Sequence, residues 1–262
     1  MEPQIQSRLD TYFRTFNAGD EAGHRAHWGS EMVYFGSSLR TTVQGLGSLQ
    51  GVWKAIREGV GVRTITPISF FGNAPELAAL VRFSGEGGES TAEASMAFQF
   101  DAFNLIKRIG VHWDPGSFLK AKEYPGRSFP LRERLVDKDP RVQATLEAYF
   151  QTFNASDEAG HAAVFHPDLC FFGSLSGMQS QGRASALGIF RSAHHSLGIS
   201  RIIPKRFFGD WPETSVLAEL SQAEGRGAID VMLVFQFDDE GLIRRLSILW
   251  DPLPFLRATG QV

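Results

Sequence analysis

Apolar residues near the start of the chain recur at helical spacing. Ile5, Leu9, Tyr12 and Phe16 fall on one face of a helix and polar residues lie between them. This pattern predicts an amphipathic helix over residues 5–16.

The next elements follow from breaks and caps. Residues 17–19 end the first helix, and Asp20 is a good N-cap for a second, shorter helix that extends to about Trp28. Residues 31–37 are rich in β-formers and predict a strand. A third helix is expected to begin at Gly45 and to end at Gly59 and Gly61. Its apolar residues are Leu49, Val52, Trp53 and Ile56.

Strand patterns fill the next fifty residues. Four strands separated by turn residues are expected at residues 62–71, 77–84, 93–100 and 105–114. On the last strand, Ile109, Val111 and Trp113 form an apolar face that should cover the helices, whereas His112 and Asp114 lie on a mixed face. Helices followed by a meander predict the α+β class, with a mostly antiparallel sheet curled around its helices.

The same order of elements occurs twice. Residues 12–24 return as residues 149–161, and Trp113 returns as Trp250, 137 residues further on. Roughly two residues in five match at this shift, which indicates a duplicated domain. The predicted division is a first domain at 1–116, a linker at 117–140 and a second domain at 141–262.

Composition narrows the class of partner. The 262 residues are 43% hydrophobic and 21% charged, which is typical of globular domains. A formal net charge of −3 argues against nucleic acid as the main partner. Cys170 is the single cysteine, so no intrachain disulfide forms, and a reducing compartment is expected. The start of the chain lacks a signal-peptide pattern and no apolar run is long enough for a membrane span, so we expect a cytoplasmic protein without a membrane partner.

The order of several motifs resembles the nuclear transport factor 2-like superfamily, which includes ketosteroid isomerases and SnoaL-type polyketide cyclases. The motifs are Tyr12 with residues 17–20, Gln44 with Gly45, residues 98–101 and residues 113–115, and in the second copy residues 237–243 and 249–252. The resemblance implies two cone-shaped α+β barrels, each with an apolar pocket. It also implies that the tandem copies form an intramolecular pseudo-dimer, and it leaves further oligomerisation open.

The resemblance also implies where chemistry would lie. Tyr12 and Tyr149 match the tyrosine that ketosteroid isomerases use as an oxyanion donor. The positions of the family's two aspartates hold Gly36 and Met96 in the first copy, and Gly173 and Leu233 in the second. Steroid-isomerase chemistry is therefore not expected. SnoaL-type cyclases place an acid–base aspartate on the last strands, where Asp114 and Asp251 are the nearest matches.

Each candidate has a structural alternative. Tyr12 and Tyr149 either donate a hydrogen bond to a substrate oxygen or are core tyrosines. His24 and His161 are either general bases or core histidines that fasten a helix to a backbone carbonyl.

The remaining candidates lie near the last strand and the third helix. Asp114 and Asp251 precede proline, where aspartate is also common in turns. His112 has Leu249 as its counterpart, so a His112–Asp114 acid–base pair would exist in the first domain alone. His194 and His195 are adjacent on a helix and point in different directions, so a metal site is not expected there, and no metal or organic cofactor is expected elsewhere.

The resemblance, together with these candidates, implies a small-molecule enzyme of the SnoaL or ketosteroid-isomerase type that isomerises, cyclises or dehydrates an apolar carbonyl compound, such as a polyketide or terpenoid intermediate. The expected pocket walls are Phe16, Tyr34, Trp53, Met96, Phe98, Trp113, Phe153 and Trp250. The alternative is a non-catalytic binding or scaffold protein with the same fold. Tyr34 has Phe171 as its counterpart, so any asymmetry should favour chemistry in the first domain.

Overall fold

A computed structural model describes residues 1–36, 41–88, 90–113, 118, 139–173, 178–222 and 227–250. The chain divides into two compact units, half one (Met1–Arg132) and half two (Glu133–Val262). The expectation that they pair as a fused dimer concerns their relative placement and stays a prediction. The linker expected at 117–140 also stays a prediction, and most of it lies outside the described residues.

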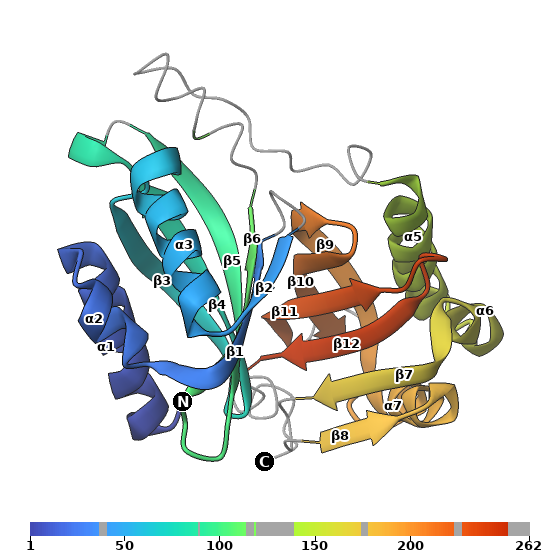
Figure 1. The fold of residues 1–262 in the computed structure, drawn as a ribbon. Coiled ribbons are helices and arrows are strands. Elements are labelled where there is room, and N and C mark those ends of the chain that lie inside the picture. The colour runs from blue at the N-terminus through green and yellow to red at the C-terminus, as the bar shows by residue number, and fades with distance from the viewer. Residues whose placement is uncertain are drawn as a thin grey trace. The chain divides into compact units, whose positions relative to one another are not determined.

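Apart from a π-helical segment and a short 3-10 turn in half one, the described parts of the two halves contain the same elements in the same order (Figure 1). The elements of half one are α1 (Pro3–Ala18), α2 (Glu21–Arg25), β1 (Trp28–Gly36), β2 (Thr41–Gln44), α3 (Leu46–Lys54), a π-helical segment (Ala55–Val60), β3 (Thr64–Asn73), β4 (Glu76–Ser84), a short 3-10 turn (Glu86–Gly88), β5 (Thr91–Phe100) and β6 (Ile106–His112). Those of half two are α5 (Pro140–Asn154), α6 (Glu158–Ala163), β7 (Phe165–Gly173), β8 (Met178–Gln181), α7 (Arg183–His195), β9 (Ile199–Asp210), β10 (Glu213–Gln222), β11 (Ala228–Phe237) and β12 (Ile243–Leu249).

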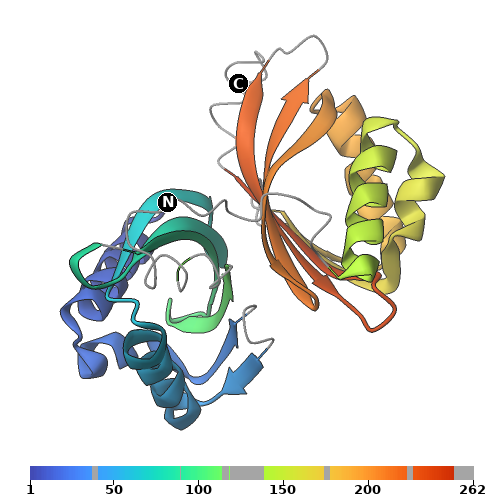
Figure 2. The same cartoon turned by 90° about the horizontal axis from the view of Figure 1, so that it is seen from above.

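Each half is built on one six-stranded sheet. Its strand order is β2-β1-β6-β5-β4-β3 in half one and β8-β7-β12-β11-β10-β9 in half two. Neighbouring strands are antiparallel except for β1 with β6 and β7 with β12, which are parallel. Within each half the sheet is curved and the helices lie against one of its faces (Figures 1 and 2). The α+β class and the duplication predicted from the sequence are therefore confirmed.

The first helix forms for the reasons that the pattern indicates. Its apolar face is buried, Pro3 occupies its first turn, and Gly19 ends it in the left-handed conformation at φ 71°. Asp20 caps α2 by accepting a hydrogen bond from the Gly23 backbone N–H at 2.9 Å, as expected.

Some boundaries differ from the prediction. The second helix ends at Arg25 instead of about Trp28, because the chain already pairs with β6 there, where the backbone N–H of Ile106 donates to the carbonyl of His27 at 2.9 Å. The short strands β2 and β8 were not predicted.

An asparagine joins the end of the first helix to the edge strand in both halves. Asn17 donates to the carbonyl of Ile65 at 3.1 Å and accepts from its N–H at 2.7 Å. Asn154 makes the same two bonds with Ile202. Because β3 and β9 are edge strands, these bonds satisfy backbone groups that the sheet leaves unpaired. None of the described helices is long and apolar enough to span a membrane.

Candidate functional site

Tyr12 lies inside half one, on the buried face of α1. Its side chain is 5% exposed, and its ring meets that of Phe98 from β5 edge-on with centroids 5.8 Å apart. Among the described residues the Tyr12 hydroxyl has no hydrogen-bond partner. Burial, together with the nearby Tyr34 phenol, raises the pKa of Tyr12 above its usual value, so the hydroxyl stays protonated and can only donate or accept a neutral hydrogen bond.

Tyr34 is a second phenol on the same side of the sheet. It pairs in register with Ile109, which faces the core, and it packs against the core cluster. The Tyr34 side chain as a whole is partly exposed, and burial raises the pKa of its hydroxyl. The Tyr34 ring lies over Gly36, because a Cβ built on that glycine would stand 3.0 Å from the ring and 3.2 Å from the hydroxyl oxygen. The ring thus fills the space into which a side chain at position 36 would project.

His24 fastens α2 to α1. Its Nδ1 lies 3.1 Å from the backbone carbonyl of Tyr12 and 3.3 Å from the hydroxyl of Thr15. A carbonyl only accepts, so Nδ1 carries the proton and Nε2 is the unprotonated nitrogen. Burial lowers the pKa of His24 from 6.5 to about 3, so the ring is neutral at neutral pH and only weakly basic. This geometry favours the structural alternative for His24.

Half two repeats this arrangement. Tyr149 is 2% exposed and burial raises its pKa, while Nδ1 of His161 lies 3.0 Å from the hydroxyl of Thr152. Burial lowers the pKa of His161 to about 4. Phe171 lies over Gly173 as Tyr34 lies over Gly36, so half two has an apolar ring where half one has a phenol.

His112 lies on the other face of the sheet. Its register partner is Ser95, and the alternation of β6 places Ile109 and Val111 toward the core cluster and His112 away from it. The His112 side chain is fully buried and its ring centroid is 5.9 Å from that of Phe35. The structure therefore does not bring His112 together with Tyr12. Asp114, its proposed partner, and Asp251 lie outside the described residues.

The side chains expected to form pocket walls are all in or against the two core clusters. Phe16, Trp53, Met96, Phe98 and Trp113 belong to the core of half one, with Tyr34 packed on it, and Phe153 and Trp250 belong to the core of half two. Met96 occupies the position of the family's second carboxyl donor as a buried core residue.

The two carboxylates that are buried among the described residues, Glu76 and Glu213, bind Gln99 and Gln236. The neighbours of Glu76 and Gln99 on their strands, Leu77 and Phe98, face the core, so Glu76 lies on the opposite face from Tyr12.

Two residues near Tyr12 were missed by the sequence interpretation. Trp28 meets His24 edge-on at 5.3 Å between ring centroids, and His27 meets Tyr12 at 6.2 Å. The counterpart of Trp28 is Phe165 and that of His27 is Val164, so a comparison of the two copies position by position would have identified both residues.

His194 occupies the position of Arg57. It stacks on Phe153 at 4.5 Å, whereas Arg57 lies over Phe16 and donates to the Phe16 carbonyl. Among the described residues no group of three or more His, Cys, Asp or Glu side chains is arranged to hold a metal ion.

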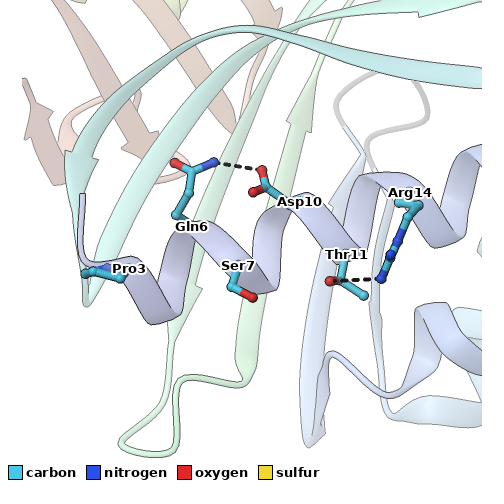
Figure 3. A pocket seen from close by; sticks show the side chains of 6 residues that line it. All are labelled: Pro3, Gln6, Ser7, Asp10, Thr11 and Arg14. Carbon is cyan, nitrogen blue, oxygen red and sulfur yellow. Dashed lines mark hydrogen bonds between the residues drawn. The ribbon is translucent and has the colours of Figure 1, made fainter.

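A surface depression of about 410 Å³ runs along the outer side of α1 (Figure 3). It is lined by Pro3, Gln6, Ser7, Asp10, Thr11 and Arg14, on the side of the helix opposite Tyr12. The polar groups bind one another, Gln6 to Asp10 at 2.7 Å and Arg14 to Thr11 at 3.3 Å. This open surface has no contact with the phenols and is not the candidate site.

Comparison with known proteins adds a likeness of fold. No family model matches the chain, and no curated protein matches it. A solved protein from Sinorhizobium meliloti, provisionally described as a polyketide cyclase, is 22% identical and covers 44% of this chain and 98% of its own, at a TM-score of 0.37. A Burkholderia pseudomallei protein described as NTF2-like and of unknown function is 18% identical and covers 46% and 98%, at 0.39.

A third solved protein, from Catenulispora acidiphila, has a ketosteroid isomerase-like fold and was solved with trimethylamine. It is 12% identical and covers 50% of this chain and all of its own, at a TM-score of 0.40. The resemblance expected from the sequence is thus also found among solved structures, in each case over half of this chain or less. The identities and TM-scores are too low to carry a function from those proteins to this one.

Proposed function

We propose that this protein is a small-molecule enzyme that polarises the carbonyl group of an apolar compound and moves a proton next to it, without a metal or organic cofactor. The observation that carries the proposal is the pair of phenols in half one. Tyr12 and Tyr34 are near each other in an apolar interior, burial raises both pKa values, and neither hydroxyl has a hydrogen-bond partner among the described residues. Donors held in such surroundings stabilise the negative charge that develops on an enolate oxygen.

His24 is a weak candidate for the group that transfers the proton. Because the pKa of His24 is about 3, the fraction of its rings that would hold an abstracted proton at neutral pH is small. Asp114, the last-strand carboxylate predicted for this step, lies outside the described residues, and the proposal names the oxyanion donor alone. Isomerisation, cyclisation and dehydration of a carbonyl compound all begin with such a step.

Exchange of α-protons for deuterium tests this chemistry without knowledge of the product. Wild-type protein in D2O should accelerate exchange at the α-carbons of 2-tetralone, an apolar bicyclic ketone, as followed by proton NMR. Tyr12→Phe should reduce the catalysed rate by about 100-fold, the usual effect of removing one oxyanion donor. Tyr149→Phe is the matched control in half two. Unchanged rates in both variants would remove the tyrosines from the mechanism.

A non-catalytic binding role is favoured by a different observation. The carboxylate positions of the related isomerases hold Gly36, covered by Tyr34, and buried Met96, and no described carboxylate is placed toward Tyr12. In that case 2-tetralone would bind, as shown by line broadening in the same spectra, while its exchange rate stayed at the level of buffer.

A further inference from the structure

The two halves provide an internal comparison of the same site. Around the His24–Tyr12 pair of half one and the His161–Tyr149 pair of half two, aromatic side chains take equivalent places. Trp28 meets His24 at 5.3 Å and 79°, and its counterpart Phe165 meets His161 at 5.1 Å and 89°. Trp53 meets Phe16 at 6.5 Å, as Phe190 meets Phe153 at 5.5 Å.

The chemistry of these equivalent places differs in one direction. Half one has a polar group at four positions where half two has a purely apolar side chain. The pairs are His27 and Val164, Trp28 and Phe165, Tyr34 and Phe171, and Trp53 and Phe190. Near these positions, half two also has a buried nitrogen with no hydrogen-bond partner among the described residues, Nε2 of His194. Its counterpart in half one is Arg57, which is polar as well.

The extra polar groups of half one are buried without partners. Trp28, Trp53 and His27 are each more than nine-tenths buried. Among the described residues, the indole N–H of both tryptophans, both ring nitrogens of His27 and the Tyr34 hydroxyl have no hydrogen-bond partner. Native proteins pair nearly all buried polar atoms, because an unpaired donor loses its hydrogen bonds to water and gains nothing in return.

The fold does not require these groups. Half two builds the same strand order and equivalent helices, without the π-helical segment that follows α3, with Val164, Phe165, Phe171 and Phe190 at these positions. Half one therefore carries a cost in stability that the architecture does not demand. Trp28 contacts His24, His27 contacts Tyr12, and Trp53 contacts Phe16, whose ring also meets His24, so these groups share one aromatic cluster. Polar groups that are costly for folding and gather in one part of a protein interior are typical of a binding site.

We propose that half one is the ligand-binding half, and that its ligand is a flat, apolar molecule with at least two acceptor oxygens. The indole N–H groups of Trp28 and Trp53 and the hydroxyl of Tyr34 would donate to those oxygens, and the aromatic rings would cover the apolar body. Half two, with phenylalanine at the same positions, would not select for oxygen. The inference deepens the proposed function by naming its substrate class and the half in which it binds.

Chromone and naphthalene are suitable probes, since they have the same bicyclic shape and chromone alone has acceptor oxygens. The five tryptophan indole N–H signals are followed by nitrogen–proton correlation NMR and assigned with single Trp→Phe variants. Chromone should shift the signals of Trp28 and Trp53 downfield and leave those of Trp211 and Trp250 unchanged. It should bind about tenfold more tightly than naphthalene, and Tyr34→Phe should reduce this ratio. Equal affinity for both probes, or shifts at Trp211 and Trp250 instead, would overturn the inference.

A second experiment needs no ligand. His27→Val gives half one the residue of half two at nearly constant volume, so it should raise the midpoint of thermal unfolding by about 2–4 °C. Val164→His, the reverse change, should lower it. A His27→Val variant that is less stable than wild type would show that His27 is required by the fold, against the inference.

The two proposals fail separately. Indole shifts without 2-tetralone exchange would leave half one as a binding site and refute the enzyme. Exchange that depends on Tyr12 without oxygen-dependent indole shifts would support the enzyme and refute the role of Trp28 and Trp53.

Discussion

The buried histidines make the stability of this protein sensitive to acid. Burial lowers the pKa of His24 from 6.5 to about 3, while in the unfolded chain the residue keeps its ordinary pKa. Between pH 6.5 and about 3, the unfolded chain therefore binds a proton that the folded chain does not. The free energy of unfolding should fall as the pH falls through this range.

The magnitude follows from the linkage relation. One pKa unit corresponds to about 1.4 kcal/mol, so at pH 5, which is 1.5 units below the unfolded pKa, His24 alone should cost about 2 kcal/mol relative to neutral pH. His161, with a pKa of about 4, should cost a similar amount in half two. Losses of this size are a large part of the stability of an ordinary domain.

His24→Asn isolates the effect, because the Asn amide N–H can replace Nδ1–H toward the Tyr12 carbonyl but does not titrate. Urea unfolding of wild type and variant is measured at pH 7.5 and at pH 5, with hydrogen exchange of peptides from α1 and α5 to assign the loss to a half. The loss of stability between the two pH values should be about 2 kcal/mol smaller in the variant, and confined to half one. His195→Asn, at an exposed histidine, is the control. If His24→Asn lost as much stability in acid as wild type, the neutral, carbonyl-bound histidine would be the wrong description.

Two further predictions concern helix ends. Ser156 has a positive φ of 55° at the position where half one has Gly19. Because glycine adopts positive φ without strain, Ser156→Gly should stabilise half two by about 1 kcal/mol in urea unfolding, and Gly19→Ser should destabilise half one. Changes of the opposite sign would contradict this conformational argument. Asn154→Ala leaves both backbone groups of Ile202 without their side-chain partner and should lower the free energy of unfolding by about 2–3 kcal/mol. Asn154→Asp keeps the acceptor oxygen and should have an intermediate effect. A loss of stability near zero in Asn154→Ala would mean that water replaces the side chain at no cost.

The sequence pattern predicted the elements whose contacts are local. The spacing of Ile5, Leu9, Tyr12 and Phe16 was enough for α1, and Gly45 and Gly61 do mark the ends of the third helical segment, as its N-cap and its left-handed C-cap. The early start of β1 was missed, because Trp28 joins the sheet only through a strand almost eighty residues away. β2 has four residues, too few for a periodic signal, and forms by pairing with β1.

The sequence predicted which residues of the candidate site lie in the interior, but not which hydrogen bonds they make. Helical period placed Tyr12 and His24 in the interior, and both are buried there. That His24 binds the backbone carbonyl of Tyr12, and not its phenol, depends on how α2 packs on α1, which the spacing of residues does not specify. Trp28 and His27 escaped notice because aromatic residues in a core pattern suggest packing.

Residues shared by the two halves and residues that differ carry different information. The histidine bond to the first helix recurs with its threonine neighbour in both halves, although their other polar groups have diverged, so it is best explained as a requirement of the fold. The phenols of Tyr12 and Tyr149 recur too, yet neither takes part in that bond, since His24 binds the Tyr12 carbonyl and His161 the Thr152 hydroxyl. The described contacts of the fold do not use this hydroxyl, and the proposed function assigns the chemistry to it in half one. Among the described residues, half one has further unpaired donors in the same aromatic cluster, so under the proposal substitutions there should change ligand binding while their counterparts in half two change stability alone.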